Sequence, residues 1–172
     1  MTLALVFRFL HLWLQTSRLP DVQPNLVIPT VIGAMHAETD EYPAELLIAI
    51  AWGESRLDPT VRTGVVCGIL QVNPTDINRP RSDCDVWSQS AEEGIQAGVI
   101  EMDMLRADSR VRGDLQLALL YRACGNAAFD GTCRKTRWPE WVIDRARCLQ
   151  MSDLTWHVDT LGRCVRTVPA SS

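Results

Sequence analysis

The feature that most constrains this chain is an apolar run, Leu46–Trp52, that leads directly into Glu54. Seven consecutive residues without a charge or a side-chain amide, bounded by charged residues, are typical of a buried segment. Pro43 suits the first turn of a helix, and Asp58-Pro59 suits its end, because the residue before a proline avoids the α region. The run therefore predicts a buried helix over about residues 43–57.

Glu54 lies on the buried stripe of this predicted helix. Leu47, Ile50, Ala51 and Glu54 follow one another at i, i+3, i+4 and i+7, so all four share one face. The carboxylate also lies in the last turn, near the negative end of the helix dipole. Because burial and the dipole both disfavour the charged form, we expect the Glu54 carboxyl to hold a proton near neutral pH, as a general acid must.

The composition is that of one globular domain and implies no cofactor. A chain of 172 residues is long enough to bury a sizeable core. Its net charge of −4 and the absence of a basic run argue against nucleic acid as the main partner. With only three histidines and no CxxC pair, the sequence does not predict a zinc site.

Six cysteines favour disulfide bonds and an oxidising compartment. They are Cys67, Cys84, Cys124, Cys133, Cys148 and Cys164. Nearest-neighbour pairing, 67–84, 124–133 and 148–164, closes three short loops and is the pairing that we predict. The alternative is a reduced protein with buried thiols.

The chain divides into three parts. Residues 1–23 are an apolar segment and a linker, residues 24–150 are a helical domain, and residues 151–172 are a polar C-terminal tail. Residues 1–15 are shorter than the ~20 residues that a membrane span needs. For this segment an amphipathic anchor in contact with a membrane, an atypical export signal and an extra packing helix all stay open.

Local signals place further helices in the 24–150 domain. Ser90 and Glu93 form a capping box, Asp114 suits a helix cap, and Pro139 suits the first turn of a last helix. Residues 62–68 predict a loop or a short hairpin. We therefore expect a mainly α fold with five or six helices around the central buried helix and at most a short β-hairpin.

Four segments follow one another in the order of a known family. Glu54-Ser55 precedes a proline-containing turn, and Gly68–Val72 reads Gly-Ile-Leu-Gln-Val. Ser90–Leu105 predicts a helix with an Ile and a Gly three residues apart, and Leu117–Gly125 is an apolar stretch with a Tyr near its end. Together they resemble the goose-type lysozyme and lytic transglycosylase family, whose motifs are Glu-Ser, Gly-Leu-Met-Gln and an Ala-rich helix ending in Tyr-Asn-Ala-Gly. The resemblance covers about residues 24–150.

The chain departs from the family pattern mainly in the third motif. Arg122 stands where the family has Asn, and Cys124 precedes the Gly, which comes one residue late. In the second motif Ile69-Leu70 replaces Leu-Met, which conserves volume. The third motif is therefore the weakest basis for transferring a role in substrate binding.

The resemblance implies a lysozyme-like fold and a peptidoglycan glycan strand as the substrate, cut between N-acetylmuramic acid and N-acetylglucosamine. Glu54 would be the catalytic acid. Ser55 would orient Glu54 or touch the sugar, Gln71 would bind substrate across the cleft, and Tyr121 would lie near Glu54 or orient the intermediate. For two of these residues a purely structural role stays open. The Ser55 hydroxyl could simply bond a helix carbonyl, and Tyr121 could simply belong to the core.

Two mechanisms are compatible with such a site. A lytic transglycosylase uses the same glutamate again as a base on the muramic acid C6 hydroxyl, which leaves a 1,6-anhydro end and needs no second carboxylate. A goose-type lysozyme activates water, usually with a second acid. The candidates for that acid are Asp76, Asp83 and Asp85, and none lies in a recognisable motif. The sequence therefore favours the transglycosylase.

Other functions stay open alongside these two. A lysozyme-like protein without activity is compatible with the fold signals, for example as a structural protein of a virion or a secretion apparatus. A chitinase-type hydrolase is a third hypothesis. The periplasm or cell envelope, secretion, and a virion are the locations that fit the cysteines and the substrate.

Overall fold

The computed structural model describes residues 24–151, 156–158 and 164–166. These residues are mainly helical, which confirms the predicted mainly α class. The helices are α2 (Pro24–His36), α3 (Ala44–Ser55), the 3-10 turn η1 (Pro74–Ile77), α4 (Asp83–Trp87), α5 (Ala91–Ala107), α6 (Leu115–Cys124), α7 (Ala127–Asp130) and α8 (Trp138–Gln150). The strands are β1 (Arg62–Thr63), β2 (Val66–Cys67), β3 (Trp156–Val158) and β4 (Cys164–Arg166). Residues 1–15, for which three alternatives stay open, lie outside the described residues.

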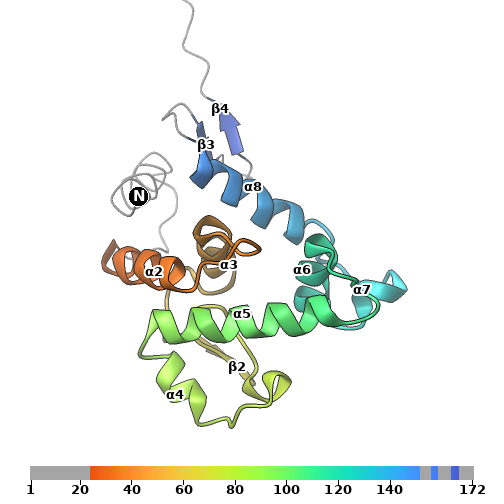
Figure 1. Ribbon diagram of the computed structural model, residues 1–172, viewed down its shortest axis with the longest axis horizontal. Coiled ribbons are helices and arrows are strands. Elements are labelled where there is room, and N and C mark those ends of the chain that lie inside the picture. The colour runs from red at the N-terminus through yellow and green to blue at the C-terminus, as the bar shows by residue number, and fades with distance from the viewer. Residues whose placement is uncertain (1–23, 152–155, 159–163, 167–172) are drawn as a thin grey trace, which may run out of the picture.

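Helix α3 is the buried helix that the apolar run predicts. It packs against α2 and α8, and Figure 1 shows it between them. Every residue from 46 to 52 is buried. Because neighbours cover α3 on more than one side, the run is apolar around the whole helix and not only along one stripe.

Both ends of α3 have a local cause. Pro43 precedes the first turn in an extended conformation, as its missing N–H allows. The helix ends two residues earlier than predicted, because Arg56 and Leu57 adopt left-handed backbone angles with φ of 58° and 67°. The Leu57 N–H donates to the Ala51 carbonyl, which closes the helix with a Schellman-type bond. Asp58-Pro59 lies just beyond this turn.

Helix α5 starts where its capping residue predicts. The Ser90 hydroxyl accepts a hydrogen bond from the Glu93 N–H at 3.2 Å. Two glycines then allow close packing: a Cβ added at Gly98 would lie 2.9 Å from the Leu70 Cβ, and one at Gly33 of α2 would lie 2.8 Å from the α5 backbone. The loop that contains Leu70 therefore lies directly on α5.

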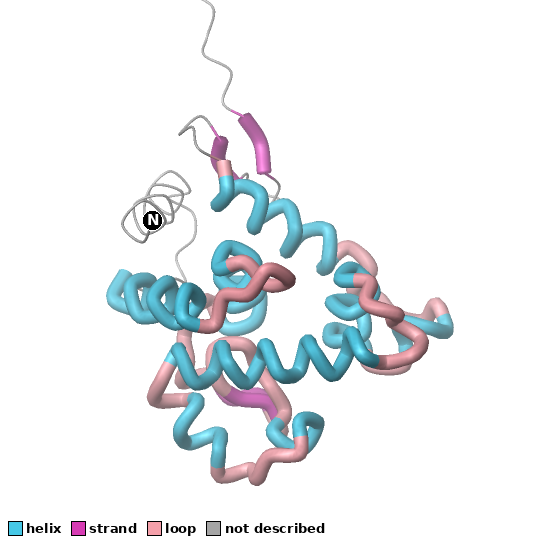
Figure 2. Tube along the Cα trace, in the orientation of Figure 1, coloured by secondary structure: helices cyan, strands magenta, loops and turns pink. Residues whose placement is uncertain are grey.

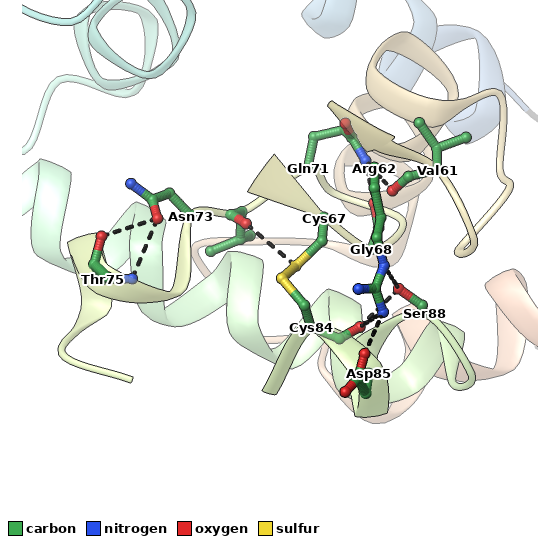
Figure 3. The surroundings of a disulfide bond; sticks show 11 residues. Val61, Arg62, Cys67, Gly68, Gln71, Asn73, Thr75, Cys84, Asp85 and Ser88 are labelled. Atoms are coloured by element: carbon green, nitrogen blue, oxygen red, sulfur yellow. Dashed lines mark hydrogen bonds and ion pairs between the residues drawn. A yellow bond between two sulfur atoms is a disulfide. The ribbon is translucent and has the colours of Figure 1, made fainter. Parts of the chain in front are cut away.

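Residues 62–68 contain the short hairpin that was one of the two predicted options. β1 pairs antiparallel with β2, with Arg62 opposite Cys67. The Cys67–Cys84 disulfide joins β2 to α4, and Arg62 adds an ion pair to Asp85 at 2.6 Å (Figure 3). Together these contacts fasten the hairpin and the following loop to α4.

The other disulfides extend this cross-linking. Cys124 at the end of α6 pairs with Cys133, so two of the three predicted pairs are confirmed. Cys148 of α8 is also disulfide-bonded. Its predicted partner, Cys164, has a side chain outside the described residues. The disulfides argue against a reduced protein and indicate an oxidising compartment.

The segment predicted as a C-terminal tail contains two short strands. β3 pairs antiparallel with β4, with Trp156 opposite Arg166, and both strands contact α8 (Figure 2). The described residues thus contain two short ladders, where at most one hairpin was expected. Strands of three residues are too short to produce a recognisable apolar alternation in the sequence.

Candidate active site

Glu54 lies in the last turn of α3, where the helix reaches the surface. Its side chain is 22% exposed, whereas Leu47 and Ile50 on the same stripe are fully buried. The carboxylate therefore lies at the rim of the core and not within it. This position lets an acid contact solvent while a rigid helix holds its backbone.

Arg122 of α6 is the residue that contacts Glu54. Its Nη1 atom lies 2.7 Å from Glu54 Oε1, and its Nε atom lies 2.7 Å from Oε2 of Glu101 on α5. Its Nη2 atom donates to the Leu70 carbonyl. The Arg122 side chain is only 4% exposed. One guanidinium thus joins the end of α3, the Leu70 loop, α5 and α6.

The electrostatics of this cluster are those of one cation shared by two carboxylates. Burial alone would lower the pKa of Arg122, but Glu101 and Glu54 outweigh it and raise that pKa. Burial raises the pKa of Glu101, and Arg122 offsets only part of this effect. The negative charges of Glu54 and Asp76 raise the pKa of Glu101 further.

The ion pair places a cation directly on the carboxylate at the end of α3. Nη1 of Arg122 lies 2.7 Å from Glu54 Oε1, and the Glu54 side chain is 22% exposed whereas that of Arg122 is buried. The site therefore combines a carboxylate in contact with solvent and a buried cation.

Ser55 fastens the end of α3 to the loop that follows the hairpin. Its hydroxyl lies 2.7 Å from the Ile69 carbonyl and 3.2 Å from the Ala51 carbonyl, and it is buried. A hydroxyl has one proton, so it donates to one of the two at a time. These contacts fit the structural explanation for Ser55 and also hold the neighbouring Glu54 in place.

Gln71 lies in a tight turn between Cys67 and Val72. The backbone N–H of each of these two residues donates a hydrogen bond to the carbonyl of the other. The Gln71 backbone is left-handed, with φ of 51°. Its Nε2 atom donates to the carbonyls of Val61 and Gly68, each at 2.8 Å (Figure 3). The amide nitrogen is therefore fully used within the protein. Among the described residues none donates to the amide oxygen.

Tyr121 contacts residues other than Glu54. Its hydroxyl bonds to Nη2 of Arg110 at 2.9 Å, and its ring packs edge-on against Phe129. The described hydrogen bonds include none between Tyr121 and Glu54. Arg122, the next residue in α6, points to Glu54 instead, and the role predicted for Tyr121 stays a prediction.

The three aspartates considered as a second acid each have a partner in the protein. Asp83 pairs with Arg79 at 2.7 Å, and Asp85 pairs with Arg62. Asp76 accepts a hydrogen bond from Asn73. Asp76 is the one whose charge reaches the cluster, through its effect on Glu101 described above.

The sequence did not single out Glu101, and it did not predict that Arg122 contacts Glu54. Glu101 follows Gly94 and Gly98 at i+7 and i+3, on the face of α5 that lies under the Leu70 loop. This glycine stripe was the available signal for Glu101. Arg122 was visible only as a departure from the family motif, and no local pattern connects it to Glu54.

The described residues contain no group of three or more histidine, cysteine, aspartate or glutamate side chains placed to hold a metal ion. Within the same part of the chain, no helix combines the length and the apolar character that crossing a membrane requires. Comparisons with protein-family models, with curated proteins and with solved structures give no match for this chain.

Proposed function

We propose that this protein is a lytic transglycosylase with a lysozyme-like catalytic domain. It would cleave the β-1,4 bond between N-acetylmuramic acid and N-acetylglucosamine in peptidoglycan and leave 1,6-anhydro ends. One observation supports the proposal best. Arg122 of α6 binds Glu54 and the Leu70 carbonyl, and it thereby joins three of the four segments that resemble the family motifs.

The proposed reaction uses Glu54 in two steps. Glu54 first gives its proton to the glycosidic oxygen, so the bond to that oxygen breaks and positive charge develops at the muramic acid C1. The resulting carboxylate then takes the proton of the C6 hydroxyl, whose oxygen bonds to C1. Atoms and protons balance without water. Arg122 stabilises the carboxylate left by the first step, which favours proton transfer to the glycosidic oxygen.

The surrounding residues fit supporting roles in this reaction. The Gln71 amide oxygen is available to accept a hydrogen bond from a sugar hydroxyl or an acetamido N–H. Ser55 holds the last turn of α3 against the second motif and so orients Glu54. Tyr121, which is partly buried and bonded to Arg110, is proposed to orient the intermediate.

Glu101 is the specific observation that favours a second candidate, a goose-type lysozyme. It places a second carboxylate on the guanidinium that binds Glu54. However, the Glu101 side chain is 13% exposed and engaged by Arg122, so it is poorly placed to activate a water molecule. We therefore retain the transglycosylase as the main proposal.

The proposed setting follows from the substrate. The disulfides fit a periplasmic, cell-envelope, secreted or virion-associated protein, and the partner is the glycan strand. If the protein does not cleave peptidoglycan, the alternative proposal is a lysozyme-like structural protein of a virion or a secretion apparatus.

Digestion of purified sacculi tests these proposals. We expect muropeptides with 1,6-anhydro ends in mass spectra, whereas reducing ends would support the lysozyme and intact sacculi would support the structural protein. Glu54→Gln should abolish cleavage and leave the circular dichroism spectrum unchanged. Glu45→Gln, in the first turn of the same helix, is the matched control and should cleave normally. Cleavage by Glu54→Gln at the normal rate would refute the mechanism.

A further inference from the structure

A second cluster of polar and aromatic side chains lies where α3 packs against α8. Arg145 of α8 is 4% exposed. Its guanidinium carbon lies 4.1 Å from the ring centroid of Trp52 and 3.0 Å from that of Trp141. Both indole rings therefore contact the guanidinium group. A further partner of Arg145 would bind through its N–H groups.

Two nitrogen atoms of the Arg145 guanidinium lack a hydrogen-bond partner among the described residues. They are Nε and Nη1, and both are buried. No carboxylate among the described residues forms an ion pair with Arg145. Cation–π contacts stabilise the charge in part, but they do not satisfy the N–H groups, and a buried unsatisfied donor is costly.

The electrostatic surroundings of the Arg145 guanidinium are positive. Burial lowers the pKa of Arg145 to about 8, and the positive charge of Arg56 acts in the same direction. Arg56 is exposed at the surface. An anion at this position would supply the missing hydrogen-bond acceptors and would also compensate two positive charges.

The cluster adjoins the proposed active site. Gly53 directly precedes Glu54, and a Cβ added at Gly53 would lie 3.0 Å from Cζ3 of Trp141 and 3.4 Å from Nε1 of Trp138. Both rings are partly exposed. Because Gly53 has no side chain, Trp138 and Trp141 pack directly against the turn of α3 that carries Glu54.

We propose that Arg145, with Arg56 beside it, is an anion subsite that receives a carboxylate of the substrate. The inference rests on the proposed function, because it is the muramic acid unit of a glycan strand that bears a lactyl-linked peptide with free carboxylates. A carboxylate is planar, and it binds a guanidinium in a bidentate manner through Nη2 and one of the other two nitrogens, Nε or Nη1. The protein would therefore prefer strands that carry charged peptides.

A matched pair of substrates tests this subsite. Soluble glycan strands with free peptide carboxylates are compared with the same strands after conversion of the carboxylates to methylamides. For the wild-type protein we expect a KM about tenfold higher on the amidated strands, with a similar kcat, because a charge-assisted hydrogen bond is lost. Arg145→Gln should have this higher KM on both kinds of strand, so it should differ from the wild type only on the strands with free carboxylates.

A control variant separates binding from loss of structure. Arg147→Gln, on the same helix and paired with Asp144 at the surface, should behave as the wild type. If Arg145→Gln does not fold, as judged by its melting curve, the wild-type comparison of the two strands still decides. Equal KM values of the wild-type protein for both strands would overturn the subsite alone. An Arg145→Gln variant whose KM exceeds that of the wild type by the same factor on the amidated strands and on the free-carboxylate strands would overturn it as well. Failure of the wild type to cleave either strand would overturn the proposed function, and the subsite with it.

Discussion

Replacing Arg122 by methionine should destabilise the protein in a way that depends on pH. Arg122 neutralises two carboxylates, and the Glu101 side chain is largely buried at 13% exposure. Methionine fills a similar volume but leaves Glu101 without its cation and the Leu70 carbonyl without its donor. Removing one partner of a buried ion pair costs about 3–5 kcal/mol.

The pH dependence follows from the raised pKa of Glu101. Without Arg122, which lowers this pKa in the wild type, the pKa of Glu101 in the folded protein rises further. Between its unfolded and folded pKa values, the folded variant binds a proton that the unfolded chain has released. The free energy of unfolding therefore falls as the pH rises through this window. The loss relative to the wild type should be large at about pH 8 and smaller at about pH 5.

Urea unfolding followed by tryptophan fluorescence, with the disulfides intact, measures this loss. The Arg122→Met protein is compared with the wild type and with the double variant Arg122→Met, Glu101→Gln. The double variant should recover more than half of the lost stability at about pH 8, because it lacks the stranded carboxylate. If the loss is the same at both pH values and Glu101→Gln restores nothing, the argument that a buried carboxylate dominates is refuted.

Three further predictions concern the scaffold of the site. Gly98→Ala should lower the free energy of unfolding by about 1–3 kcal/mol, because the added methyl group meets Leu70; an unchanged melting temperature would contradict this close packing. Replacing Cys67 and Cys84 together by serine should cost about 3 kcal/mol in urea unfolding, as expected for a disulfide that spans 17 residues; equal midpoints for the two proteins would argue against the bond. Ser90→Ala should cost about 1 kcal/mol through the loss of a helix cap, and thermal melting that matches the wild type would show that the cap contributes nothing.

Local sequence signals predicted the elements that depend on neighbouring residues. Pro43 and Ser90 placed the starts of two helices correctly, because caps involve residues within one turn of each other. The end of α3 was misplaced by two residues, since the left-handed backbone at Arg56 is not the conformation that its residue type favours. The β3–β4 ladder was missed because each strand is too short for a periodic pattern.

The candidate site was predicted only in part. Glu54 and Gln71 were singled out from short motifs, and the structure places Leu70, next to Gln71, on the guanidinium that binds Glu54. Arg122 and Glu101 could not be assigned in this way, because Arg122 lies 68 residues from Glu54 and 21 from Glu101 along the chain. Contacts at such separations depend on how α3, α5 and α6 pack.

The sequence by itself determined that this chain forms a mainly helical domain around one apolar helix that ends in an acid. The apolar run and the caps are local, and burial of apolar surface is not directional. Only the tertiary structure decided the electrostatic environment of that acid. Ion pairs require a specific distance and geometry, and the packing of α6 against α5 and α8 brings Arg122 to Glu54 at the end of α3. A buried cation shared by two carboxylates is therefore a property of the fold and not of any one motif.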